Sequence, residues 1–97
     1  MLDVAYNDVS MALQFHQLKP VDDKAMDVDE FLDDTLRALV LSKSLAQNGY
    51  AAAPFLGNLA VEMKKAHDAL NGKDSPSEQV LAAFIDAAID DINISRY

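Results

Sequence analysis

The sequence predicts an all-α fold: a compact bundle of about four helices with antiparallel neighbours, forming one domain over residues 1–97. Three observations support this prediction. Apolar residues recur at intervals of three and four over long segments, which is the period of a helix buried on one side. Residues that favour helix starts and ends bound these segments. A chain of 97 residues is also close to the common size of a single domain.

The N-terminal segment, residues 1–18, fits two interpretations. A helix is indicated by apolar residues at helical spacing: Leu2, Ala5, Val9, Ala12 and Leu13. A strand is indicated by an alternating set: Val9, Met11, Leu13 and Phe15. We favour the helix, because the rest of the chain is helical and a lone strand or hairpin is marginally stable. Pro20 ends this element, and the longest predicted loop runs from Lys19 to Met26.

The clearest predicted helix runs from Val28 to Asn48. Asp27 is a favourable N-cap, Glu30 stands where a capping box requires it, and Gly49 is a natural stop. The first half has one apolar stripe, whereas the second half is apolar around most of its circumference. Such a helix is expected to be buried on more than one side, at the centre of the protein or against a partner chain.

The third and fourth predicted helices have equally distinct boundaries. Pro54 suits the first turn of the third helix, and Gly72 follows its end. Ser75 is expected to cap the fourth helix, with Pro76 in its first turn and Glu78 completing a capping box. The apolar positions of all four helices predict a core: Val9, Leu13, Phe31, Leu36, Leu39, Phe55, Leu59, Met63, Leu81, Phe84, Ile85 and Ile89.

Composition excludes several functional classes. The 16 acidic and 8 basic residues give a net charge of -8, which repels nucleic-acid phosphates and anionic membranes and favours basic partners. The chain has no cysteine, so it forms no disulfide and no thiolate metal site. No apolar run approaches the ~20 residues of a membrane span, and the N-terminus does not resemble a signal peptide. We therefore expect a cytoplasmic protein that binds neither nucleic acid nor membrane directly.

The candidate catalytic and metal-binding residues fit structural roles better. Counted from Asp27, the sixth and twelfth positions of a calcium loop would be Leu32 and Ala38, where glycine and glutamate are needed. His16 and His67 lie at the edges of apolar stripes and form no metal-binding pair at helical spacing. We therefore predict no catalytic residue, no metal and no cofactor. Lys43, near the apolar stripe of its helix, is expected to extend from the core edge to solvent in preference to pairing with an acid on another helix or subunit.

Two surfaces are candidates for binding a partner. The first is the acidic cluster around the start of the Val28–Asn48 helix, with the candidate residues Asp22, Asp23, Asp29, Glu30, Asp33 and Asp34. The second is a homodimer interface made of apolar residues that the core does not require: Met11, Phe15, Leu41 and Leu45.

These surfaces lead to two functional predictions. The first is a small, acidic, non-enzymatic protein–protein interaction or adaptor protein that forms a homodimer. The alternative is an acidic inhibitor, of the kind that phages encode or that mimics nucleic acid, which occupies a basic site on a nucleic-acid-binding protein. Both predict a protein partner, and the alternative specifies a basic one.

Overall fold

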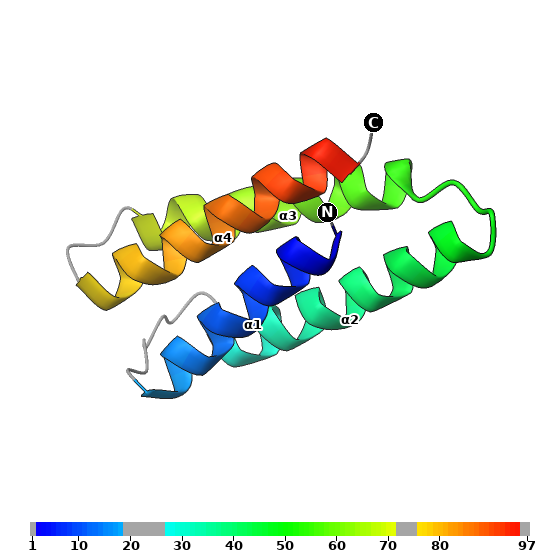
Figure 1. Cartoon of the computed structure of the whole chain (residues 1–97). Coiled ribbons are helices and arrows are strands. Elements are labelled where there is room, and N and C mark those ends of the chain that lie inside the picture. Colours follow the sequence, from blue (N-terminus) through cyan, green and yellow to red (C-terminus); the bar gives the residue numbers. More distant parts are fainter. Residues whose placement is uncertain (1, 19–26, 72–75, 96–97) are drawn as a thin grey trace.

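Four helices make up the described part of the chain in the computed structural model, which covers residues 2–18, 27–71 and 76–95. They are α1 (Leu2–Leu18), α2 (Val28–Gln47), α3 (Ala53–Asn71) and α4 (Pro76–Ser95). The helices form an elongated bundle of 42 × 21 × 20 Å (Figure 1). The predicted all-α bundle is confirmed, and the described residues include no strand.

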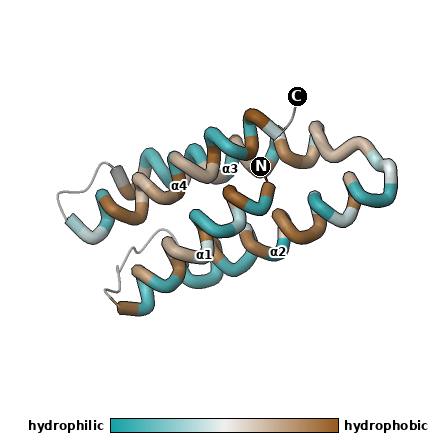
Figure 2. The backbone as a smooth tube through the Cα atoms, viewed as in Figure 1, coloured by the Kyte–Doolittle hydropathy of each residue, from teal (hydrophilic) through white to brown (hydrophobic). Residues whose placement is uncertain are grey.

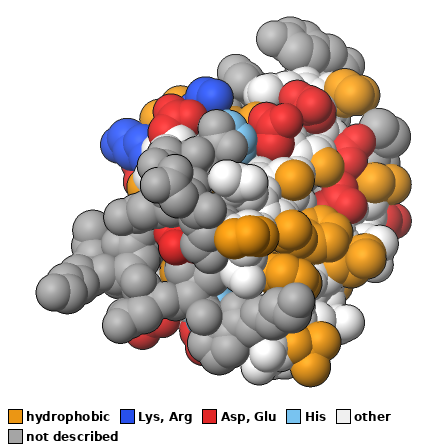
Figure 3. Space-filling view, turned by 90° about the vertical axis from the view of Figure 1, so that its left-hand side faces the viewer, with side chains coloured by type: hydrophobic (Ala, Val, Ile, Leu, Met, Phe, Trp, Pro, Cys, Tyr) orange, Lys and Arg blue, Asp and Glu red, His pale blue; other side chains and the backbone are white. Residues whose placement is uncertain are grey.

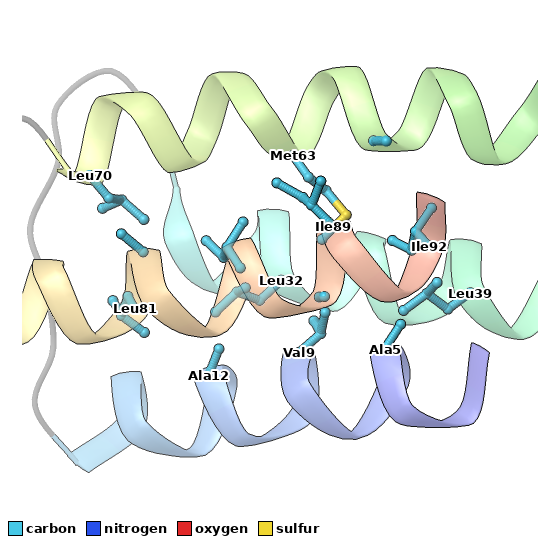
Figure 4. Close-up of a cluster of buried hydrophobic side chains, with 14 of the residues drawn as sticks. Ala5, Val9, Ala12, Leu32, Leu39, Met63, Leu70, Leu81, Ile89 and Ile92 are labelled. Carbon is cyan, nitrogen blue, oxygen red and sulfur yellow. The ribbon is translucent and has the colours of Figure 1, made fainter. Parts of the chain in front are cut away.

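The four helices do not contact one another equally. α4 packs closely against both α1 and α3, and α1 also packs against α2, whereas α2 and α3 make few contacts. Residue numbers rise in opposite directions along α1 and α4, and successive helices traverse the long axis back and forth (Figures 1 and 4). α4 and α1 are therefore the two helices that each have two close neighbours.

Local sequence explains where the helices begin and end. Asp27 caps α2, because its side chain accepts a 3.1 Å hydrogen bond from the Glu30 amide. Gly49 has a φ of 81°, and the amide of Tyr50 donates to the carbonyl of Leu45. This left-handed glycine with its returning hydrogen bond is a Schellman motif, which ends α2 as the sequence predicted. Pro76 opens α4, also as predicted. The predicted Ser75 cap and the Lys19–Met26 loop lie outside the described residues.

The N-terminal segment is a helix, so the strand interpretation is wrong. Ala5, Val9, Ala12 and His16 are buried in α1 at the helical spacing. The alternating positions Met11 and Leu13 do not share a buried face, since Met11 is exposed and Leu13 is half-buried. The residues of this segment are therefore buried at the spacing of a helix and not at alternate positions.

The centre of the core is made of aliphatic residues and alanines (Figure 4). Half of the predicted core is fully buried: Val9, Leu39, Met63, Leu81, Ile85 and Ile89. Of the three predicted core phenylalanines, Phe31 and Phe84 are half-buried and pack against this core, and Phe55 is half-buried. The small residues Ala82 and Ala88 of α4 are fully buried, whereas the rings lie at the rim of the core.

The second half of α2 is not central. Figure 2 shows apolar residues in every helix, α2 included. Val40 is 57% exposed and Leu41 is 50% exposed, whereas Leu39 between its neighbours is buried. The second half of α2 therefore exposes part of its apolar circumference to solvent. The prediction that this segment lies at the centre of the protein is wrong.

Shortening a core leucine should destabilise the protein far more than shortening a surface one. Leu32→Ala removes a fully buried side chain and should lower the free energy of unfolding by about 2–5 kcal/mol. Leu41→Ala makes the same change at an exposed position of the same helix and should alter it by less than about 0.5 kcal/mol. Urea unfolding measures both. Equal losses from the two substitutions would contradict the described packing of α2.

Candidate functional site

The predicted acidic surface is partly engaged in contacts within the protein. Asp29, in the first turn of α2, lies 2.7 Å from Nδ1 of His16 in the last turn of α1. Asp33 forms a 2.9 Å ion pair with Arg37 one turn later. Glu30 and Asp34 are exposed and have no ion pair with a described residue. The predicted residues Asp22 and Asp23 lie outside the described part of the chain.

The His16–Asp29 contact links the last turn of α1 to the first turn of α2. The imidazole of His16 is buried, whereas the carboxylate of Asp29 remains 62% exposed. With its proton on Nδ1, the imidazole donates a hydrogen bond to this carboxylate. The acid at the start of α2 and the histidine near the end of α1 also suit the dipoles of their helices. His16 is thus a link between α1 and α2.

The hydroxyl groups in the core do not form a nucleophile site. Thr35 donates a 2.9 Å hydrogen bond to the carbonyl of Phe31, and Ser42 donates a 2.8 Å bond to the carbonyl of Ala38. Both hydroxyls are therefore bonded within α2, which is an ordinary way to bury such a group in a helix. No group of three or more potential metal ligands occurs among residues 2–18, 27–71 and 76–95.

The four residues of the predicted dimer interface lie on two separate surfaces. Lys43 of α2 contacts Asp3 of α1 at 2.8 Å and therefore marks the side of α2 that faces α1. Leu41 and Leu45 are each two residues from Lys43, about 200° around the helix, so they lie on the side away from α1. Met11, which is 44% exposed, belongs to a different surface beside α4. The Lys43 contact also corrects the expectation that this lysine only extends to solvent.

The surface beside α4 is located by two neighbouring acids. Asp8 in α1 and Asp91 in α4 are both half-buried, and Asp91 is near enough to Asp8 to raise the pKa of the Asp8 carboxyl, after the effect of burial. Val4, Met11 and Phe15 are four, three and seven residues from Asp8, so they share its side of α1. The equivalent side of α4 carries the apolar residues closest in helical phase to Asp91, which are Val80, Phe84, Ala87 and Ile94.

We call this surface the α1–α4 face, defined by Val4, Met11 and Phe15 of α1, by Val80, Phe84 and Ile94 of α4, and by the Asp8–Asp91 pair. Phe15 and Phe84 pack partly against the core, and the four aliphatic side chains are exposed. Figure 3 shows apolar side chains gathered between acidic ones on the right of the view, the side on which α1 and α4 lie. The face is an apolar surface with a carboxyl pair within it.

The cations of the described residues are all used elsewhere. Arg37 pairs with Asp33, Lys43 with Asp3, Lys64 with Asp68 and Lys65 with Glu62, at 2.8–3.3 Å. Within residues 2–18, 27–71 and 76–95, no cation forms an ion pair with Asp8 or Asp91. The pair is therefore not neutralised by this part of the chain.

Asp8, which has no ion pair with a described cation, has a raised pKa. Burial raises the pKa of Asp8 above its ordinary value, and the neighbouring charge and hydrogen bond of Asp91 raise it further. Ion pairing has the opposite effect at Asp3, whose pKa is lowered by the hydrogen bond and charge of Lys43. A carboxylate pair on an apolar surface is thus a site where added positive charge would be favourable.

Charged residues also line a shallow depression between α3 and α4. Lys64 and Lys65 border it on α3, and Asp86 and Asp90 border it on α4. Both lysines pair with acids of their own helix, Glu62 and Asp68. His67, beside Asp68, keeps only 15% of its side chain exposed and lies at the rim of the core as predicted.

Comparison with known proteins gives no family for this chain. No protein-family model matches it, and neither does any curated protein or solved structure. Among the described residues, no helix is both long and apolar enough to cross a membrane.

Sequence reasoning identified part of this geometry. It singled out Met11 and Phe15 as apolar residues beyond the needs of the core, and both lie on the α1–α4 face. It missed the Asp8–Asp91 pair and the His16–Asp29 link, since both join different helices and depend on how those helices are rotated. Helical spacing could have placed Asp8 beside Met11 and Phe15, but no sequence pattern indicates the carboxyl group opposite.

Neutralising Asp8 should stabilise the protein most at neutral pH. Because the pKa of Asp8 is raised in the folded state, that state binds the proton more tightly, and stability from this group rises as the pH falls. Asp8→Asn should therefore exceed the wild type in free energy of unfolding at pH 7, and the advantage should shrink toward pH 3.8. Urea unfolding across this range measures the difference.

A double-mutant cycle supplies the control for this prediction. Asp91→Asn should give a smaller gain than Asp8→Asn, because it removes the neighbouring charge but leaves Asp8 partly buried, and the double variant should gain less than the sum of the two. Additive gains with no dependence on pH would contradict the contact between the two carboxyl groups.

Asp29 should contribute more to stability than the matched acid Asp33. Asp29→Ala removes the hydrogen-bond partner of a buried imidazole and should lower the free energy of unfolding by about 1 kcal/mol. The loss is smaller than for a fully buried pair because the Asp29 carboxylate is largely exposed to water. Asp33→Ala removes an exposed pair within one helix and should cost about 0.5 kcal/mol or less. Thermal and urea unfolding would show a reversed order if the inter-helix link were unimportant.

Proposed function

We propose that this chain is a small, acidic, non-enzymatic interaction protein that binds another protein through exposed helix surfaces. The observation that carries the proposal is the α1–α4 face, on which Met11 and Val80 are 44% and 38% exposed beside the half-buried rings of Phe15 and Phe84. A contiguous exposed apolar surface on a small soluble domain is typical of a protein-binding site. Exposed acids elsewhere suit a role in solubility.

Self-association remains part of this proposal. Leu41 and Leu45 lie on the side of α2 that faces away from α1, and Leu41 is 50% exposed. A homodimer formed there would leave the α1–α4 face available to a partner, as an adaptor requires. A dimer interface is expected to be more apolar than the rest of the surface, and these leucines satisfy that condition.

The acidic inhibitor is the second candidate. The exposed acids Glu30 and Asp34 on the first turns of α2 favour it, because they have no ion pair with a described residue. Two of the acids first assigned to that surface serve the fold in part: Asp29 contacts His16 and Asp33 contacts Arg37. Charge reversal at Asp29 would therefore combine a loss of binding with a loss of stability. Glu30→Gln with Asp34→Asn tests this candidate more cleanly.

A comparison of matched variants tests the proposal. The tagged protein is used to recover partners from the source cell's lysate, with nuclease treatment and at two salt concentrations. Met11→Ser with Val80→Ser should abolish recovery of a stoichiometric partner, since both changes remove apolar area from the α1–α4 face. Leu41→Ser with Val61→Ser changes equally exposed residues on α2 and α3 and should leave recovery unchanged.

Light scattering on the same variants separates the alternatives. Recovery of no other protein together with a monomeric mass would contradict an interaction function. A basic partner lost only with the Glu30 and Asp34 substitutions would support the inhibitor. A dimer that becomes monomeric with the Leu41 and Val61 substitutions would support self-association through α2.

A further inference from the structure

The α1–α4 face has the shape and charge to receive one more helix. α1 and α4 run side by side in opposite directions, so their outer side is a long, shallow surface parallel to both axes. From Val4 to Phe15 this surface extends over about 16 Å, which is roughly three helical turns. Apolar residues at helical spacing on a partner helix are the usual occupant of such a surface.

Charge on the face favours a cationic occupant. Asp8 and Asp91 lie among the apolar residues of the face, on facing helices that pack closely together, and they are half-buried neighbours. The lysines and arginine of the described residues pair with other acids, so a positive charge at Asp8 and Asp91 must come from outside this part of the chain. An Arg or Lys at that point would make charge-assisted hydrogen bonds to both carboxylates and remove their mutual repulsion.

The same charges disfavour a second copy of the chain at this face. Each copy has a net charge of -8, and a two-fold pairing of this face would bring another set of the same carboxylates against it. Like charges that face each other across an interface repel and so suppress the wrong partner. A self-associated form is therefore expected to use another surface.

We infer that the α1–α4 face binds a cationic amphipathic helix of a partner protein. Its apolar side chains rest on Met11, Val80 and the neighbouring rings, and an Arg or Lys side chain meets Asp8 and Asp91. This inference rests on the proposed interaction function and adds the position of the site and the chemistry of the partner. The carboxyl pair gives the surface its preference for a basic partner, and the apolar residues supply the area that is buried on binding.

A synthetic peptide provides the probe for this inference. The peptide has about 14 residues, or roughly four helical turns, with leucines and one central Arg on the face that meets the protein and Lys on the opposite face. A control peptide replaces each Lys and Arg by Gln, and a second control has a scrambled order. Fluorescence anisotropy at about 0.15 M salt, where long-range attraction is screened, measures affinity. Amide and methyl chemical shifts locate the bound peptide on the full chain.

We expect the cationic peptide to bind with one-to-one stoichiometry and to shift signals of Val4, Met11, Val80 and Ile94. Asp8→Asn with Asp91→Asn should weaken binding about tenfold without lowering the unfolding midpoint, because the substitution removes a repulsion in the free protein. The matched variant, Glu30→Gln with Asp34→Asn, removes two charges from α2 and should weaken binding by less than about threefold. Met11→Ser should also weaken binding, whereas Leu41→Ser should not.

Several results would overturn the inference. Shift changes confined to α2 and α3, or equal losses from the two charge variants, would mean that the peptide recognises acidity and not this face. A dimer of the free protein that Met11→Ser dissociates would give the face to a second copy. Absence of any shift at the face with the cationic peptide would remove the proposed partner chemistry. In each case, a partner recovered by the tagged protein would still support the interaction function itself.

Discussion

The burial of α4 against both α1 and α3 is the interaction on which the rest of the structure depends. α4 has more buried residues than α1 or α2. They are Leu81, Ala82, Ile85, Ala88, Ile89 and Ile92. In proteins, most of the stability of a helix comes from the apolar area that packing buries. α2 joins this assembly chiefly through α1, and therefore the position of α1 determines where α2 lies.

This arrangement explains why the chain has apolar residues at its surface. α1 packs against α2 on one side and α4 on the other, and small residues such as Ala5 and Ala12 fill its buried face. Its longer side chains, including Met11 and Phe15, are consequently left at the outer edge beside α4. The Asp8–Asp91 pair stands in the same place, although a partly buried carboxylate beside a second acid reduces stability at neutral pH. Local features that oppose stability are expected at functional surfaces, and here the feature coincides with exposed apolar area.

Most of the fold could be predicted from the sequence, because the information needed is local. Asp27, Gly49 and Pro76 determine helix ends through the hydrogen bonds and backbone angles of a few residues. The periodicity of α3 and α4 likewise identifies their buried faces. The exact core could not be predicted, since the choice between Phe84 and Ala88 as a central residue depends on how closely two helices approach. The candidate site was predicted only in part for the same reason: Met11 and Phe15 stand out as surplus apolar residues, but the meeting of Asp8 with Asp91 requires the rotation of two helices.

Solvent accessibility of individual methyl groups, measured by NMR with a soluble paramagnetic agent, tests the central claim most directly. The free protein should show strong relaxation at the methyl groups of Met11, Val4, Val80 and Ile94, and protection at those of Val9, Leu81, Ile85 and Ile92. This result would establish an open apolar face over α1 and α4 in solution, beside a buried core. Protection of Met11 and Val80 in the free protein would show that the face is already covered, and it would contradict the account of this surface as a site for a partner.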